Sequence, residues 1–199
     1  NFLIAYNINL NTLDKKIASD IALDIREAGR AKRDSNGKIL RNKSGKIIKV
    51  PGTLKATKAV GWYLDEYKIS QVSMNLTDYT KTSIHDAFEE VRVQARKRGV
   101  RVTGSEIVGL IPQTALIEAG NYYLEKQKKS QGIPNQDIMQ VAVMSLGLND
   151  ITNFNLKEKI IENLIDLENN LSSMPINDFL DLLSTDSPAP GGGSIAALG

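Results

Sequence analysis

Alternating hydrophobic and polar residues predict four β-strands in the first half of the chain. In the strand expected at residues 2–10 every second residue is apolar, so one face of that strand is hydrophobic. The strands expected at residues 59–64 and 71–77 alternate as well, and their short connection predicts an antiparallel hairpin. The fourth strand is predicted by a β-branched run at residues 100–103.

Apolar residues three or four positions apart predict two long helices between these strands. The first, at residues 13–28, has a stripe of leucine, isoleucine and alanine and ends at Gly29. The second, at residues 84–98, begins after a capping Ser83 and ends in basic residues, which the helix dipole favours there. Further helices are expected at residues 115–127, 137–146 and 156–165.

The order strand–helix–strand–strand–helix–strand predicts the ferredoxin-like, split-βαβ arrangement of an α/β (α+β) protein. Both helices should cover one face of the sheet, because the crossovers have a fixed hand. Val60, Trp62 and Leu64 would then lie beneath the helices. The other face would be open and polar, carrying Asn7, Asn9, Tyr63, Gln71, Ser73, Asn75, Thr77 and Thr103. We expect this open face to contact a polar ligand or another protein domain, and the pattern favours neither.

A glycine-flanked polar segment follows the fourth predicted strand. It runs from Gly104 to Gly109 and contains Ser105 and Glu106. An elbow between a strand and a helix is a common place to present side chains to a ligand. Glu106 could orient a substrate amine or cap the helix that follows Pro112, and both interpretations stay open.

The segment between the first helix and the second strand is strongly basic. Residues 30–58 contain ten lysines or arginines and one acid, Asp34. Turn signals divide the segment, which predicts a protruding hairpin rather than a separate domain. No internal repeat is evident. The positive charge suits an anionic ligand, although a solvated loop is the simpler explanation.

Composition limits the chemistry that the chain can perform. None of the 199 residues is cysteine and one is histidine, which excludes disulfides, thiolate metal sites and His-rich metal sites. No apolar run is long enough to span a bilayer, and we expect a cytoplasmic protein. His85 lies in the first turn of the second predicted helix, where the dipole disfavours imidazolium and a structural role is favoured.

Several stretches, in order, resemble the C-terminal half of the catalytic domain of glutamate formimidoyltransferase. They are Asn7–Leu10, Ile25–Arg30, Ala59–Leu64, Gln71–Leu76, Gly104–Pro112 and Lys157–Glu162. Residues 187–194, Ser-Pro-Ala-Pro-Gly-Gly-Gly-Ser, resemble the opening of a formimidoyltetrahydrofolate cyclodeaminase. The resemblance divides the chain into a transferase subdomain at 1–165, a linker at 166–174 and the start of a cyclodeaminase at 175–199.

This resemblance implies a folate-dependent enzyme of histidine degradation. Such enzymes transfer a formimino group from N-formimidoylglutamate to tetrahydrofolate, the expected co-substrate, and no metal is expected. Folate lies between two α/β halves in this family, so the open face would be turned toward the folate and the N-terminal half. That half, absent here, carries the acid–base histidine, so no catalytic residue is expected in this chain. The candidate folate- or substrate-facing residues are Asn7, Asn9, Tyr63, Ser73, Asn75, Ser105 and Glu106.

The chain is expected to be an inactive piece of a longer polypeptide that forms homo-oligomers and binds neither nucleic acid nor membranes. Two alternatives stay open. The same strand order serves RNA-binding modules, although Tyr63 is almost the only aromatic expected on the open face for base stacking. The other is a docking domain whose polar face contacts only protein. Whether the basic segment holds an anionic polyglutamyl tail is also left open.

Overall fold

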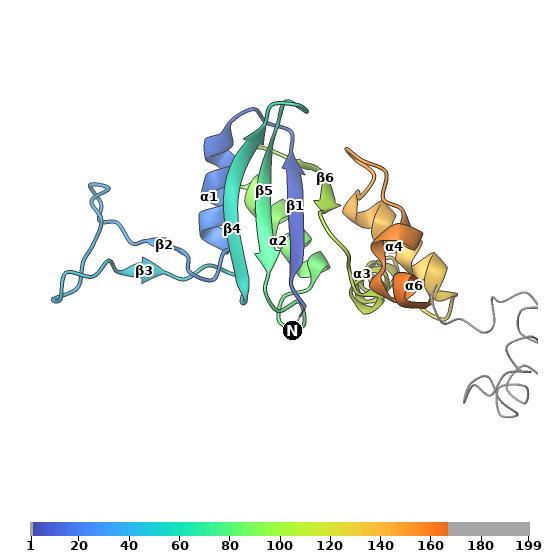
Figure 1. The fold of residues 1–199 in the computed structure, drawn as a ribbon. Coiled ribbons are helices and arrows are strands. Elements are labelled where there is room, and N and C mark those ends of the chain that lie inside the picture. Colours follow the sequence, from blue (N-terminus) through green and yellow to red (C-terminus); the bar gives the residue numbers. More distant parts are fainter. Residues whose placement is uncertain (1, 167–199) are drawn as a thin grey trace, which may run out of the picture. The chain divides into compact units, whose positions relative to one another are not determined.

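The computed structural model describes residues 2–166 and contains one four-stranded antiparallel sheet (Figure 1). Its strands are β1 (Ile4–Leu10), β4 (Thr57–Leu64), β5 (Ile69–Leu76) and β6 (Val102–Ile107), in the spatial order β4–β5–β1–β6. Two helices make the crossovers: α1 (Lys15–Ile25) between β1 and β4, and α2 (Ile84–Arg96) between β5 and β6. This topology confirms the predicted ferredoxin-like arrangement.

Both crossover helices cover one face of the sheet and leave the other face uncovered by them, as Figure 1 shows. The covered face holds the core. Alternate β1 side chains, from Ile4 and Tyr6 to Ile8 and Leu10, have no exposed surface there. The helix α1 begins two residues later than predicted, because the Asp14 carboxylate accepts a hydrogen bond from the backbone N–H of Lys16 at 2.8 Å and caps it.

The edge strand β6 differs from the prediction. It was expected to end at Thr103, but it continues to Ile107 because Ser105 and Glu106 pair with Ile8 and Asn7 of β1. An irregularity in the β1–β6 register lies between Ile8 and Leu10. Residues 104–107 of the predicted polar elbow are therefore part of the sheet.

Three helices of the main unit follow β6. They are α3 (Gln113–Lys126), α4 (Asn135–Leu146) and α5 (Leu156–Lys159). The last helix was predicted to run unbroken from residue 156 to 165, but Ile160 has extended backbone and pairs with Ile111, which ends α5. The helix α6 (Ile161–Asp166) begins a second unit. Beyond Asp166, the predicted linker and the cyclodeaminase start lie outside the described residues.

The basic segment forms an arm, defined here as residues 30–50, which extends from the β4 side of the sheet (Figure 1). Its base is a short antiparallel pair, β2 (Arg30–Ala31) with β3 (Lys49–Val50). Isolated bridges join Arg33 to Ile39 and Arg41 to Ile47. No arm residue belongs to the described buried core. The predicted protruding hairpin is thus confirmed, in a more elaborate form.

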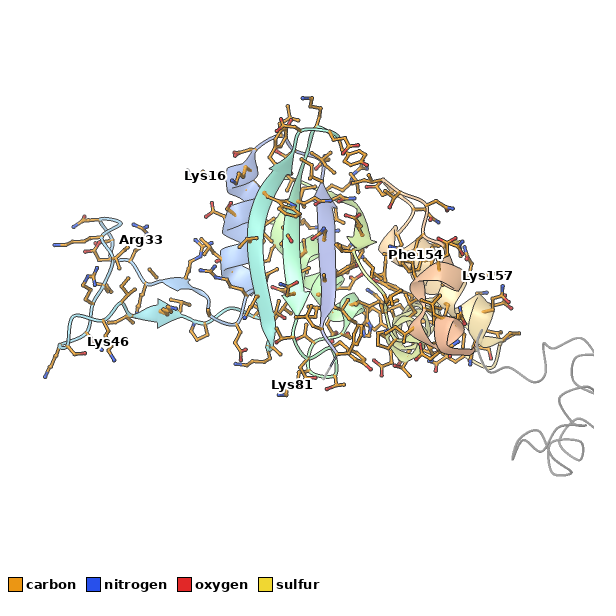
Figure 2. The ribbon with its side chains drawn as sticks, viewed as in Figure 1. Lys16, Arg33, Lys46, Lys81, Phe154 and Lys157 are labelled. Carbon is orange, nitrogen blue, oxygen red and sulfur yellow. The ribbon has the colours of Figure 1, made fainter. Side chains whose placement is uncertain are left out.

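The arm contains an internal repeat that the sequence analysis missed. Residues 33–40 (Arg-Asp-Ser-Asn-Gly-Lys-Ile-Leu) and 41–48 (Arg-Asn-Lys-Ser-Gly-Lys-Ile-Ile) form the same turn twice. In the first, Asp34 Oδ1 accepts from the backbone N–H groups of Asn36 and Lys38, and in the second Asn42 Oδ1 accepts in the same pattern. The repeat is hard to recognise in the sequence because the turn residue is aspartate in the first copy, Asp34, and asparagine in the second, Asn42. Figure 2 shows Arg33 and Lys46 on the arm, away from the sheet.

Candidate functional site

The open face of the sheet is a grid of side chains in three rows that run across the strands. Strand register defines the rows. From β4 toward β6, the first row contains Trp62, Gln71, Asn9 and Thr103, the second Val60, Ser73, Asn7 and Glu106, and the third Lys58, Asn75 and Ala5. Amides and hydroxyls dominate the centre of the face, as predicted.

The first row is a continuous chain of hydrogen bonds. Trp62 Nε1 donates to Gln71 Oε1 at 2.8 Å, and Gln71 Nε2 donates to Asn9 Oδ1 at 2.6 Å. Asn9 Nδ2 donates to Asp150 Oδ2 at 2.9 Å, and the hydroxyl of Thr103 donates to the same oxygen at 2.8 Å. Asn9 and Gln71 have no exposed surface, so this row is structurally ordered rather than freely available to a ligand.

The second row is more accessible to a ligand at Ser73 and Glu106 than at Asn7, which is 4% exposed. Asn7 Nδ2 donates to Glu106 Oε2 at 3.3 Å, which turns the amide oxygen of Asn7 away from the β6 edge. Ser73 is half-buried between Asn7 and an exposed Val60. This row can therefore accept and donate hydrogen bonds beside a small apolar surface.

Charge varies across the face. Lys58 lies on β4 opposite Asn75, and both residues are exposed. The two carboxylates, Glu106 and Asp150, lie at the β6 side. The face can therefore orient a polar molecule that carries positive or hydrogen-donating groups at one end and negative groups at the other.

The structure corrects the placement of Tyr63. Trp62 pairs with Gln71 and donates to it on the open face, so the alternation of the strand places Tyr63 on the helix-covered face. Gly61 confirms this register, because a side chain there would overlap the backbone of Ala18 and Ser19 in α1. The predicted apolar set on β4 was therefore inverted: Val60 and Trp62 lie on the open face.

Ser105 is also removed from the candidate ligand-facing set. It is 1% exposed and lies on the covered side of the sheet. Its hydroxyl accepts a hydrogen bond from Tyr6 Oη at 2.9 Å and donates to the carbonyl of Leu146 in α4 at 2.7 Å. Burial raises the pKa of Tyr6 well above its usual value, so the phenol stays a donor. Ser105 joins the sheet to α4.

Two open questions about single residues are answered by the geometry. Glu106 does not cap α3, whose N-terminus at Pro112 has no side-chain cap, and it accepts from Asn7 instead. His85 lies in the first turn of α2, on the covered side, and its ring stacks on Tyr122 of α3 with 4.5 Å between centroids. Desolvation by burial lowers the pKa of His85, although Asp86, Glu118 and Glu89 oppose that shift. A structural role fits His85.

Two residues of the site were missed from the sequence. Trp62 was assigned to the wrong face because both faces of β4 carry apolar or aromatic side chains, so alternation alone does not show which face the helices cover. Asp150 was not considered, because it follows α4 and is 141 positions from Asn9 in the chain. The available signal was the pair Gly104 and Gly147, which allows the two segments to approach closely.

The described residues contain no group of three or more His, Cys, Asp or Glu that could hold a metal ion. Within residues 2–166 no helix has both the length and the apolar character needed to cross a membrane. Neither finding identifies a ligand.

Comparison with known proteins gives the family. The model of the formiminotransferase domain matches residues 5–166, which include the whole four-stranded sheet except Ile4. The chain belongs to the formiminotransferase domain family. The match to this formiminotransferase domain confirms the resemblance that the sequence motifs carried.

Relatives of this formiminotransferase-domain chain are themselves longer proteins. The formimidoyltransferase-cyclodeaminase of Dictyostelium discoideum is 40% identical over 202 residues, covering 100% of this chain and 34% of that protein. The formimidoyltransferase-cyclodeaminase of Gallus gallus is 38% identical, covering 98% of the chain and 34% of that protein. A glutamate formimidoyltransferase of Thermoplasma acidophilum is 38% identical over 132 residues, covering 66% of the chain and 36% of that protein. The chain therefore spans about a third of the length of these curated relatives.

Proposed function

We propose that the chain is the folate-facing half of a transferase that moves the formimino group of N-formimidoylglutamate to tetrahydrofolate. The observation that carries this proposal is the uncovered polar grid, with Asn7, Ser73 and Asn75 at its centre. Membership of the formiminotransferase domain family and the names of the relatives support the reaction. The reaction exchanges one amine for another at the formimino carbon and needs no oxidant or reductant.

The open face would act by binding and orientation rather than by acid–base catalysis. The hydroxyl of the half-buried Ser73 and the amide of the exposed Asn75 can accept and donate hydrogen bonds to a pterin or a glutamate, and Asn7 lies beside them, 4% exposed. His85 lies on the covered side against Tyr122, which fits the expectation that the acid–base histidine belongs to the N-terminal half. We expect the chain alone to have no turnover.

The parent protein is proposed to be bifunctional. Relatives that align with 98% or more of the chain are named formimidoyltransferase-cyclodeaminase. The glycine-rich run at residues 191–194 agrees with a cyclodeaminase that begins near residue 175. That boundary, the cytoplasmic location and the homo-oligomer remain predictions.

The RNA-binding alternative is less well supported. Among the described residues of the three rows, Trp62 is the one aromatic side chain available for base stacking. Glu106 and Asp150 at the β6 side would repel phosphates. A docking domain that contacts only protein is separated from the folate proposal by ligand binding.

Asn75→Ala in the full-length enzyme tests the proposed function. Asn75 is exposed and its side chain makes no hydrogen bond within the described residues, so replacing it by alanine should not unfold the sheet. We expect the KM for tetrahydrofolate to rise about fivefold, as for the loss of one ligand hydrogen bond. Gln140→Ala, on an exposed position of α4, is the matched control and should leave the KM unchanged. Unchanged kinetics in Asn75→Ala would count against the folate-facing role.

A further inference from the structure

The first row of the open face is a hydrogen-bond relay whose direction is fixed at both ends. An indole N–H can only donate and a carboxylate can only accept. With Trp62 at one end and Asp150 at the other, the two amides between them can take only one orientation if every bond is made. Each amide then presents its oxygen toward β4 and its nitrogen toward β6.

The fixed orientation matters because the amides are buried. Gln71 and Asn9 have no exposed surface, and an amide turned the wrong way would place two donors or two acceptors against each other. Such a clash leaves a buried polar group without a partner. The carboxylate of Asp150, an exposed residue, therefore fixes the amides from the β6 side, as the indole of Trp62 does from the β4 side.

Close backbone packing brings Asp150 to this point. A side chain at Gly104 would overlap Asp150 Cβ and lie 2.6 Å from the carbonyl oxygen of Gly147. Gly147 adopts a left-handed conformation, with φ of +60°, and ends α4. The turn after α4 therefore lies directly against β6, and the hydroxyl of Thr103 adds a second donor to Asp150 Oδ2.

The other end of the relay is the indole of Trp62. The residue is 39% exposed on β4, and the relay fixes its N–H toward Gln71. The next position on the same face of β4 is Val60, which pairs with Ser73 in the second row. A flat aromatic surface beside hydrogen-bonding groups suits a flat heteroaromatic ring.

We propose that Asp150 is a positioning residue, which acts through Asn9 and Gln71 to hold the Trp62 indole as a stacking surface on the open face. The ligand that would stack on this indole is a flat, hydrogen-bonding heteroaromatic ring. This role in ligand binding rests on the proposed folate-facing function. Without the carboxylate, water can occupy its place. Water both donates and accepts, so the indole alone would then set the direction of the amides, and this ring is 39% exposed and can turn its N–H to solvent.

The first experiment reads the relay itself in the 199-residue chain, whose single tryptophan gives one indole N–H signal in ¹H–¹⁵N correlation spectra. Asp150→Ala should shift this signal and raise its hydrogen-exchange rate about fivefold, because the distant indole loses its defined acceptor. A carboxylate that merely anchors the turn after α4 would leave the indole unaffected.

Two variants control that experiment. Asp150→Glu keeps a carboxylate, which can only accept, and should restore the wild-type indole signal. Glu106→Gln alters the neighbouring row and should leave the indole signal unchanged, since Glu106 bonds Asn7 rather than the relay. An indole signal in folded Asp150→Ala that matches wild type would overturn the proposal.

The second experiment measures the functional consequence in the full-length enzyme. Asp150→Ala should raise the KM for tetrahydrofolate about fivefold while kcat changes less than twofold, and Asp150→Glu, which keeps the carboxylate, should restore the KM. A shifted indole signal with an unchanged KM would retain the relay but contradict its role in folate binding. If Asn75→Ala also left the KM unchanged, the folate-facing role itself would fail.

Discussion

The two faces of this sheet both contain polar networks, yet the networks have different tasks. On the covered face, Tyr6 and Ser105 are completely or almost completely buried, and their bonds end at the carbonyl of Leu146. On the open face, the relay through Asn9 and Gln71 ends at the exposed indole of Trp62. A polar residue in a strand is thus a ligand candidate only when its network reaches solvent.

The largest expected difference between the faces is in stability, and two serines test it. Ser105→Ala leaves the buried phenol of Tyr6 without an acceptor and should lower the free energy of unfolding by about 1–3 kcal/mol. Ser73→Ala, on the open face, should change it by less than about 0.5 kcal/mol. Urea denaturation of both variants provides the comparison.

A double variant sharpens this result. Tyr6→Phe combined with Ser105→Ala removes both buried partners, so it should be less destabilised than the sum of the single variants. If Ser73→Ala and Ser105→Ala lowered the free energy of unfolding equally, the proposed difference between the two faces would be wrong.

A smaller effect should come from the pH dependence of the covered side. Because burial lowers the pKa of His85, the unfolded chain binds its proton more readily than the folded chain. Stability should therefore fall as the pH drops below about 6.5, the unperturbed histidine value. His85→Gln should flatten this part of the stability profile.

Three carboxylates near His85 limit the expected size of this pH effect. Asp86, Glu118 and Glu89 favour the protonated ring and therefore oppose the lowering of its pKa by burial. The indole signal of Trp62, on the opposite face, should not follow this titration. If the free energy of unfolding depended on pH in the same way in His85→Gln and in wild type, His85 would not be the cause of the pH dependence.

The smallest effect is expected from the arm, which belongs to neither face. The backbone N–H of Lys32 donates to the carbonyl of Ile48, so these two residues are paired at the base of the arm. Residues 33–47 can therefore be replaced by Asn-Gly, which forms a two-residue hairpin turn between paired residues. The free energy of unfolding should change by less than about 1 kcal/mol, because no arm residue lies in the described core. A thermal unfolding transition lost on this deletion would show that the arm supports the sheet.

Much of the fold could be predicted because it depends on local patterns. The alternation in β1 and the stripes of α1 and α2 gave the topology and the open face, including Asn7, Ser73 and Asn75. The predictions that were wrong concern features that depend on residues distant in the sequence. The face of Trp62 depends on how closely α1 approaches Gly61, and the length of β6 depends on pairing with β1.

The functional site shows the same division between local and distant information. Strand alternation identified the amides, but it could not show that Asn9 and Gln71 are buried and bonded to each other. Ser105 looked like a loop residue because its strand partner lies 97 positions earlier, at Ile8. Asp150 belongs to a turn after α4, and no pattern along the chain connects it to β1.

The central claim is that the open face forms a wall of the folate site, and a crystal structure of the complete transferase domain with bound folinic acid tests it most directly. The account predicts that the ligand lies within hydrogen-bond distance of Asn7, Ser73 or Asn75, next to Trp62. A ligand bound elsewhere, with protein alone covering these residues, would contradict it.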